Sequence, residues 1–230
     1  MNVNQKISVD LVKYQKAMNF SAKKDVRYYL LGVCIQPCPI GGTMIVATDG
    51  HALGAFHDPK GQCDKEVILS LDKRDLTQYI KEGAVRATIE RKEENQVEIT
   101  LYCKDKCDPQ YEIRKAWHNK DVIIDGRFPE WQRVVPSDLP ETDQPLSNGV
   151  RVSNLDKFRF TKVASREGAG IRMYPTEDKG KGAILVFIDK EPDFVGVVMP
   201  TKWDQEEQNK GSWWFKVKKQ ETEEYMKKAA

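Results

Sequence analysis

The sequence predicts an α+β fold in which a helix followed by several antiparallel strands occurs twice. Helical periodicity is found at 8–19 and again at 70–82, and short strand-like segments of alternating character follow each of these stretches. The two helical stretches start about 62 residues apart, which is the spacing of an internal repeat. We therefore predict two similar half-units packed into one domain.

The first half-unit begins with an amphipathic helix over residues 8–19. At about 100° per residue, Leu11 and Tyr14 share the apolar face, and Ser8 or Asp10 can cap the start of the helix. Asp-Gly at 49–50 is typical of a tight turn between two strands, because glycine accepts positive φ. Strands are predicted at 28–36, 43–48, 50–57 and 66–70.

The second half-unit repeats this order. Its helix covers residues 70–82, with Leu76 and Tyr79 on the apolar face and Gly83 as its C-terminal stop. Strands are predicted at 85–92, 96–103, 110–116 and 121–125.

Composition changes mark the domain organisation. We predict one domain over 1–136, a proline-rich linker over 137–149, a partial domain over 150–203 and a tail over 204–230. The partial domain combines a helix at 152–164 with strands at 170–174, 183–189 and 193–200. The tail contains Trp213 and Trp214, which we expect either to cover an open sheet edge or to dock as a peptide into a pocket.

Composition also limits the class of protein. Hydrophobic residues make up 40% and charged residues 31%, with a formal net charge of +2, as in a soluble globular protein. No apolar run reaches the roughly 20 residues that span a bilayer. The first residues contain no signal-peptide core. We therefore expect a cytoplasmic protein with no membrane partner.

The five cysteines favour reduced thiols over a disulfide framework or a metal site. Two C-x3-C pairs (Cys34 with Cys38, Cys103 with Cys107) could supply four zinc ligands, but structural zinc sites usually have two residues between the cysteines. We expect no metal and no cofactor.

Four motifs occur in the chain in a specific order: DVRYYLLGV at 25–33, ATDGHALG at 47–54, DGRFPEWQRVVP at 125–136 and FVGVVMPTKW at 194–203. Together they resemble the middle domain and closing segment of the bacterial replicative sliding clamp, the beta subunit of DNA polymerase III. The resemblance covers residues 6–136 and, more loosely, 150–203. It implies clamp domains arranged in a ring, with helices facing duplex DNA and sheets outside. Clamps of this family have three full domains, whereas this sequence shows one and about half of another.

The resemblance also implies a hydrophobic pocket for short linear peptides. Its wall would be mostly apolar with a few polar anchors, which suits the burial of Leu and Phe side chains. Two departures from the family concern this pocket: Ala52 replaces the usual Arg of TDGHR, and Thr201 and Trp203 replace the usual Met and Leu after VVMP. The expected pocket residues are Arg27, Leu30, Thr48, Gly50, His51, Leu53, Pro129, Arg133, Val134, Val197, Val198, Met199 and Pro200.

Basic residues on the helices and in one loop are the candidate DNA contacts. Phosphate contacts of this kind are independent of sequence and sensitive to salt, as a sliding protein requires. For each lysine the alternative is a solvated helix face, and Asp72 and Asp75 dilute the charge of the second helix. The candidates are Lys13, Lys16, Lys23, Lys24, Arg74 and Lys81.

No catalytic motif is present. The sequence contains no phosphate-binding glycine loop, no H-E-x-x-H and no nucleophile elbow, and its three histidines lack metal-ligand spacing. The leading hypothesis is a non-catalytic, sliding-clamp-like replication protein. Its expected partners are polymerase, clamp loader or other proteins with clamp-binding peptides, duplex DNA and further copies of itself. Two alternatives remain: a decoy that competes with a host clamp, and a zinc- or histidine-dependent enzyme on a clamp scaffold.

Overall fold

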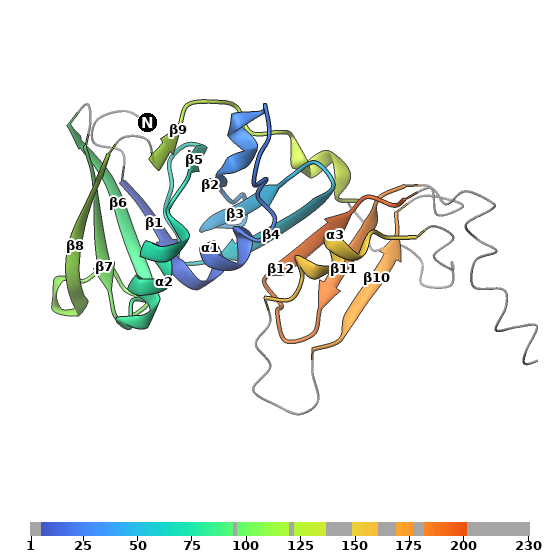
Figure 1. Cartoon of the computed structure of the whole chain (residues 1–230). Helices are drawn as coiled ribbons and strands as arrows, with labels where there is room; N and C mark the ends of the chain where they lie inside the picture. Colours follow the sequence, from blue (N-terminus) through green and yellow to red (C-terminus); the bar gives the residue numbers. More distant parts are fainter. Residues whose placement is uncertain are drawn as a thin grey trace, which may run out of the picture.

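The computed structural model describes residues 6–93, 96–119, 122–136, 149–160, 169–176 and 182–201. Two antiparallel sheets dominate it; the first two helices lie side by side, and the third lies apart from them beside the C-terminal strands (Figure 1). One sheet has four strands in the order β1-β6-β7-β8. The other has eight, in the order β10-β11-β12-β4-β3-β2-β5-β9. The predicted α+β class is confirmed.

The first half-unit starts with a strand, not with the predicted helix. Residues Lys6–Asp10 form β1, and α1 covers only Leu11–Ala17. The prediction that the helix starts at Ser8 was therefore wrong. Ile7 and Val9 alternate into the core, as strand residues do. Asp10 is the cap, since its carboxylate accepts hydrogen bonds from the backbone amides of Val12 and Lys13.

Four strands follow α1 in this half of the molecule: β2 (Val33–Pro37), β3 (Thr43–Thr48), β4 (Ala52–Asp58) and β5 (Val67–Leu69). The aromatic run before β2 is a 3-10 helix at Tyr28–Leu31. The strand therefore begins at Val33, five residues later than the predicted start at residue 28. Leu30 is buried on this short helix, whereas Tyr28 remains more than half exposed.

The second half-unit repeats the order. Helix α2 covers Lys73–Lys81 and is capped by Asp72, 62 positions after Asp10. Strands β6 (Arg86–Glu93), β7 (Gln96–Tyr102) and β8 (Glu112–Asn119) follow, with a 3-10 turn at Pro109–Tyr111 before β8. The short β9 (Ile123–Ile124) then returns to the larger sheet, and a 3-10 turn covers Trp131–Val134.

The two half-units exchange their first strands. β1 precedes α1 but pairs with β6 of the second half-unit, and β5 precedes α2 but pairs with β2 of the first. Each repeat is therefore strand, helix and three strands, whereas the sequence repeat placed all four strands after the helix. Because each sheet contains a strand from the other half, the two halves share one core.

The C-terminal segment extends the larger sheet. It contains α3 (Val152–Asp156), β10 (Ile171–Pro175), β11 (Ile184–Ile188) and β12 (Phe194–Val198), and β12 pairs antiparallel with β4 over five residue pairs. Gly196 stands opposite Gly54 in this pairing. A Cβ at Gly54 would lie 2.4 Å from the Phe20 ring, and one at Gly196 would lie 2.5 Å from the Phe158 ring. The two glycines thus leave space for two rings at the junction.

Five phenylalanines seal this junction. Phe194 of β12 contacts the four other rings at centroid distances of 4.8–6.1 Å. The rings come from both segments, so one hydrophobic cluster contains residues of β1, α1, β4, α2 and β12. The participating rings are Phe20, Phe56, Phe158, Phe160 and Phe194.

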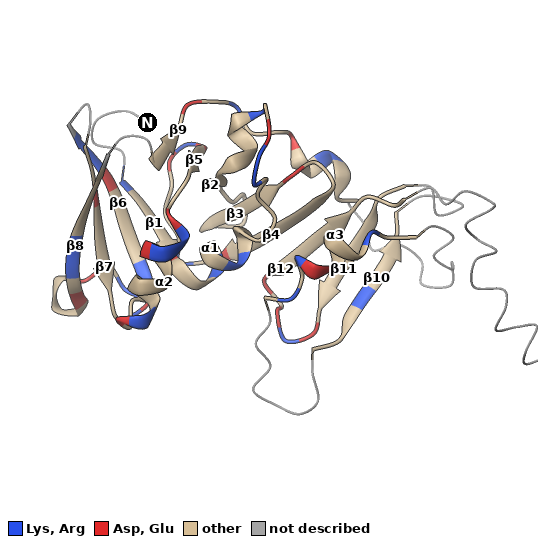
Figure 2. Cartoon of the chain, in the orientation of Figure 1, with Lys and Arg blue, Asp and Glu red and all other residues tan. Residues whose placement is uncertain are grey.

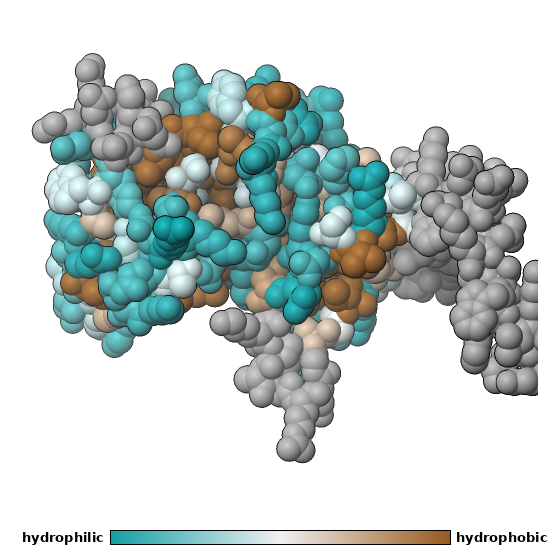
Figure 3. All heavy atoms as spheres, in the orientation of Figure 1, coloured by the Kyte–Doolittle hydropathy of each residue, from teal (hydrophilic) through white to brown (hydrophobic). Residues whose placement is uncertain are grey.

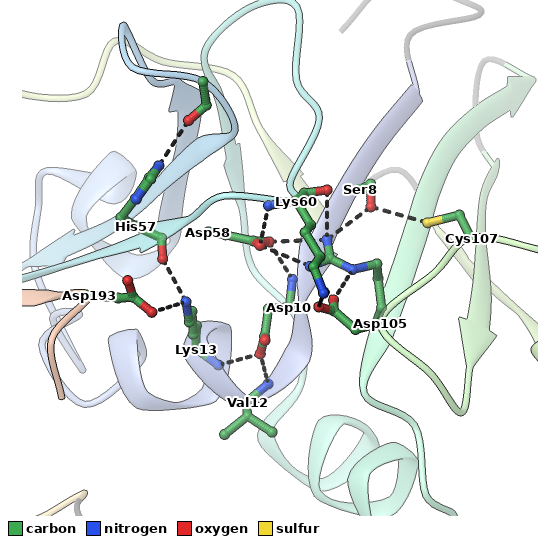
Figure 4. Close-up of polar contacts among 12 residues, drawn as sticks. Ser8, Asp10, Val12, Lys13, His57, Asp58, Lys60, Asp105, Cys107 and Asp193 are labelled. Atoms are coloured by element: carbon green, nitrogen blue, oxygen red, sulfur yellow. Dashed lines mark hydrogen bonds and ion pairs between the residues drawn. The ribbon is translucent and has the colours of Figure 1, made fainter. Parts of the chain in front are cut away.

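A buried ion pair joins the two sheets. Arg86 of β6 is 1% exposed, and its guanidinium donates to both carboxylate oxygens of Asp58 at the end of β4. Figure 4 shows Ser8, Asp58 and Asp105, which surround this site. Ser8 and the Asp105 carboxylate accept further hydrogen bonds from Arg86. A buried cation needs such complete pairing, because an unpaired charge would be costly to remove from water.

Several sequence predictions fall partly or wholly outside the described residues. These are most of the linker at 137–149, the end of the helix at 152–164, and the tail at 204–230. The proposed domain boundaries remain predictions. Among the described residues, no helix is long and apolar enough to cross a membrane.

Candidate functional site

A cavity lies where the turn between β3 and β4, the 129–134 segment and the end of β12 meet. Its volume is about 220 Å³ and most of its lining residues are apolar. The lining residues are Arg27, Leu30, Thr48, Gly50, His51, Ala52, Leu53, Pro129, Glu130, Trp131, Val134, Val197 and Met199.

The turn at 48–52 is held by its own side chains. The Asp49 carboxylate accepts hydrogen bonds from the backbone amides of His51 and Ala52, both at 3.0 Å. The Thr48 hydroxyl donates to the Ala52 carbonyl at 2.9 Å and accepts from the Gly50 amide at 3.0 Å. Asp and Thr are suited to this role because their short polar side chains reach the backbone two residues on. The cavity wall at this turn is therefore preformed.

Two contacts join this turn to the C-terminal segment. The Met199 amide donates to the His51 carbonyl at 2.8 Å. The Lys157 ammonium, next to α3, pairs with the Asp49 carboxylate, and both side chains are mostly buried. Burial acts to raise the pKa of Asp49, but Lys157 and the turn amides outweigh it, so this pKa lies below its ordinary value. The stability that Asp49 contributes is thus present at neutral pH and is lost as the pH falls through its lowered pKa.

The opposite wall is built around Trp131. This side chain is 8% exposed, and its indole N–H donates to Gln36 at 3.4 Å. Glu130 beside it pairs with Arg133 at 2.5 Å and with Arg127 at 3.1 Å. These ion pairs are exposed and contribute little stability. The Arg133 side chain is 79% exposed and lies along the surface rather than in the cavity.

Arg27 is the basic group of the cavity wall. Its guanidinium donates two hydrogen bonds to the Asp25 carboxylate, at 2.8 and 3.0 Å. These hydrogen bonds lower the pKa of Asp25 to about 2. Arg27 and Asp25 are both charged at neutral pH, so they add little net charge to this edge of the cavity.

The structure brings together ten of the thirteen residues predicted for the pocket. Arg133, Val198 and Pro200 do not line it. Val198 is fully buried, because successive strand residues point to opposite faces and Val197 takes the cavity side. Sequence reasoning missed three lining residues: Ala52, which was noted only as a departure, and Glu130 and Trp131, which lie inside the quoted GRFPEWQRVV motif.

A second cavity of about 370 Å³ adjoins the first and shares His51 and Met199 with it. Its remaining lining residues are Arg151, Asn154, Pro200 and Thr201. Arg151 is exposed, whereas Asn154 is 6% exposed. This second cavity is therefore more polar than the first, and Met199 forms part of both walls.

The predicted DNA contacts differ in their surroundings. Lys13 and Lys16 on α1 are paired with Asp193 and Glu191 at 2.8 and 2.5 Å. Lys23 and Lys24 are exposed in the loop after α1, and Arg74 and Lys81 are exposed on α2. Figure 2 shows acidic residues interspersed with the basic ones around α1 and α2. The face of the molecule drawn in Figure 3 is mostly hydrophilic.

The titratable side chains are dispersed. His51 lines the cavity, His57 Nε2 lies 2.8 Å from the Gly41 carbonyl, and His118 Nε2 lies 2.7 Å from the Tyr79 hydroxyl. Within the described ranges, no group of three or more His, Cys, Asp or Glu side chains could hold a metal ion. Most of the residues that line the cavity are apolar, so its wall is suited to contact with apolar side chains.

Comparison with solved structures identifies the architecture. The chain aligns with the DNA polymerase sliding clamp of Pseudomonas aeruginosa at a TM-score of 0.59 and 18% identity, over 88% of this chain and 67% of that one. The beta subunit of DNA polymerase III from Thermotoga maritima gives a TM-score of 0.58 at 12% identity, over 89% of this chain and 67% of that one. The fold is that of the bacterial sliding clamp.

Sequence comparison also finds a bacterial sliding clamp. The clamp-like chain is 24% identical over 195 residues to the beta sliding clamp of Vibrio cholerae, covering 79% of this chain and 49% of that protein. It therefore spans about half the length of this curated relative. A further solved clamp from Pseudomonas aeruginosa, at a TM-score of 0.53 and 18% identity, is bound to griselimycin. No family model matches the chain.

Proposed function

We propose that this chain is a non-catalytic, clamp-like replication protein that binds short linear peptides of polymerase or clamp-loader partners. The observation that carries this proposal is the cavity between the 48–52 turn and the end of β12. Ten residues expected there from the clamp motifs surround it, although they come from four segments of the chain. Residues brought together in this way form a concave, largely apolar site of the kind that binds side chains of a partner.

The shape and chemistry of the two cavities suggest how a peptide binds. Leu30, Leu53 and Val197 give the first cavity an apolar wall suited to Leu or Phe side chains. Burying one such side chain contributes about 1.5–3 kcal/mol. The adjoining cavity offers Arg151 and Asn154 to the polar residues of the same peptide. Met199 lines both cavities, and its flexible thioether can adapt to different peptides.

The binding test uses fluorescence anisotropy with a labelled peptide that carries a glutamine followed by Leu and Phe. The variant Met199→Ala removes a side chain that is 43% exposed, so the fold should be unaffected. We expect it to weaken binding by about fivefold to thirtyfold, the cost of losing one buried anchor. Griselimycin, bound by the similar Pseudomonas clamp, serves as a competitor.

Two matched controls make this test specific. Ile40→Ala also shortens an exposed apolar side chain, at 83% exposure, but Ile40 does not line either cavity. A peptide with Ala in place of Leu and Phe should fail to bind. Equal binding of both peptides, or equal affinity of Met199→Ala and the wild type, would show that the cavity is not the peptide site.

DNA association is a separate part of the proposal. A clamp fold suggests sequence-independent contact with duplex DNA by an assembly of several copies. The test is native mass by light scattering, with and without nicked circular DNA. A defined oligomer that stays on circles and leaves linear DNA supports a ring. A monomer that binds peptide but is not retained on circles supports the decoy, which shares the pocket but forms no ring.

A further inference from the structure

The turn between β11 and β12 covers the exposed side of α1 with two carboxylates. Glu191 pairs with Lys16 at 2.5 Å, and the side chains are only 17% and 21% exposed. Asp193 pairs with Lys13 at 2.8 Å, and Figure 4 shows the Lys13 ammonium between this carboxylate and the His57 carbonyl. Both α1 lysines that sequence analysis assigned to DNA are therefore neutralised within the chain.

The backbone of this turn is fixed in the position that makes these contacts. Lys190 has a φ of +70°, the one non-glycine residue with positive φ in the described part of the chain. Such a conformation is costly for a side chain other than Asn, Asp or Gly and persists only where its surroundings enforce it. Here the amide of Glu191 donates to the Ile188 carbonyl, and the carbonyl of Asp193 accepts from the His57 amide at 2.8 Å. The turn thus places both carboxylates beside α1, with Glu191 largely buried and Asp193 43% exposed.

Glu191 also lies in the wall of a hollow on the helix side. The hollow has a volume of about 550 Å³ and is lined by parts of α1 and α2 and by residues of the C-terminal segment. Three of its lining residues are basic, namely Lys16, Lys73 and Arg159, and Glu191 is the single carboxylate among them. Of these three cations Lys16 is the most buried, and it is the one that pairs with Glu191, whereas the exposed Arg159 pairs with Asp156.

We propose that Glu191 and Asp193 act as internal substitutes for DNA phosphates and hold down the affinity of α1 for nucleic acid. This inference rests on the proposed association with duplex DNA. A phosphate can contact Lys16 or Lys13 only by displacing a carboxylate that is tethered beside it, so each contact gains less than it would on a free lysine. In the binding-ready state the Glu191 and Asp193 side chains have turned away from the two lysines, while the backbone of the turn stays in place.

The test compares isosteric variants of the two acids. Glu191→Gln, Asp193→Asn and the double variant are titrated against a labelled 30-base-pair duplex at several salt concentrations between 50 and 200 mM. We expect the affinity at the lowest salt to rise at least about threefold for each substitution. The salt dependence should steepen by about 0.9 in log–log slope for each lysine that becomes free to contact a phosphate.

Asp189→Asn is the matched control. Asp189 lies on the same turn, and its substitution removes the same charge, but its carboxylate faces Arg172 of β10 at 3.6 Å. Its affinity for the duplex should stay within the error of the wild type. In a second control, Glu191→Gln combined with Lys16→Gln should lose the gain. Thermal unfolding of each variant establishes that it is folded.

Three results would overturn the proposal: no gain in Glu191→Gln and Asp193→Asn, an equal gain in Asp189→Asn, or a gain that survives Lys16→Gln. Failure of every folded variant to bind the duplex would also overturn it. The peptide titration separates the latter result from the proposed pocket, because peptide binding that persists leaves the pocket function standing.

Discussion

Helices α1 and α2 have the same build but face different surroundings. Each helix follows a strand, β1 of the four-stranded sheet or β5 of the eight-stranded sheet. Each starts at an aspartate cap and buries a tyrosine in the core. Tyr14 of α1 is fully buried, and its hydroxyl donates to the Leu69 carbonyl at 2.8 Å. Tyr79 of α2 instead meets the part-buried His118 of β8. The repeat thus preserves the inward face of the helix.

The outward faces differ because the C-terminal segment covers only one of them. On α1, Lys16 lies against Glu191 and Phe160. On α2, Arg74 and Lys81 are exposed. The same kind of basic helix face is therefore neutralised in one half-unit and open in the other. The comparison shows that helix sequence determines what is buried, whereas a distant segment decides which charges remain available.

The largest expected effect comes from removing the cover of α1. Phe194→Ala deletes the ring at the centre of the five-phenylalanine cluster and should lower the free energy of unfolding by about 3–5 kcal/mol. Urea denaturation measures this change. Trp117→Ala on β8, where the side chain is 55% exposed, is the control and should cost less than about 0.5 kcal/mol. Similar losses in both variants would contradict the claim that the five-phenylalanine cluster stabilises the junction between β4 and β12.

A smaller effect should separate the two tyrosines. Tyr14→Phe removes a hydroxyl that donates to the Leu69 carbonyl and accepts from the Leu71 amide. Both backbone groups are buried, and each loses its hydrogen bond to this hydroxyl. We expect a loss of about 1–3 kcal/mol in the free energy of unfolding. Tyr79→Phe removes one hydrogen bond to a histidine that water can reach, so its loss should be smaller. Equal losses would show that the two half-units are energetically equivalent.

The smallest effect concerns the two caps. Burial and the neighbouring Asp58 raise the pKa of Asp10, so its ionised form is disfavoured in the folded protein. Asp10→Asn keeps a good capping side chain and should be neutral or slightly stabilising at pH 7. Asp72→Asn loses a negative charge at an exposed helix start and should cost about 0.3–1 kcal/mol. Thermal unfolding at pH 7 compares the two.

The same pair of variants gives a pH test with a defined sign. A carboxyl with a raised pKa in the folded state binds its proton more readily there than in the unfolded chain. Its contribution to stability therefore grows as the pH falls through the folded pKa. This component should disappear in Asp10→Asn and persist in Asp72→Asn. A pH profile of Asp10→Asn that parallels the wild type would exclude Asp10 as its source.

Much of the fold was predictable because its signals are local. Helical periodicity placed Leu11, Tyr14, Leu76 and Tyr79 on inward faces, and the Asp49-Gly50 turn was expected where the structure has it. β1 was missed because five residues are too few to establish alternation, and a serine within them resembled a helix cap. The run at 28–31 has the composition of a strand, but its backbone forms a 3-10 turn.

Most residues of the cavity wall were also predictable from local motifs, but the ion pairs of the α1 lysines were not. Its wall comes from short motifs whose backbone turns are determined locally, such as Thr48 and Asp49 bonding to their own turn. Strand alternation would have excluded Val198, and the aromatic Trp131 inside its motif was a signal for burial. The partners of Lys16 and Lys13 are 175 and 180 residues away, and no local pattern indicates such a pair.

The pairing of β4 with β12 also has a consequence during synthesis. β4 ends at Asp58 and β12 begins at Phe194, so roughly 140 residues must be translated between them, which takes on the order of 10 s at ribosomal rates. Throughout that time the nascent chain presents one edge of β4, with the apolar ALGAF sequence, to its surroundings. An arriving chaperone or a neighbouring nascent chain can reach this edge before β12 does. The yield of folded protein should therefore depend on how quickly the last third of the chain is translated. It should also depend on which chaperones and nascent chains are close to it during that time.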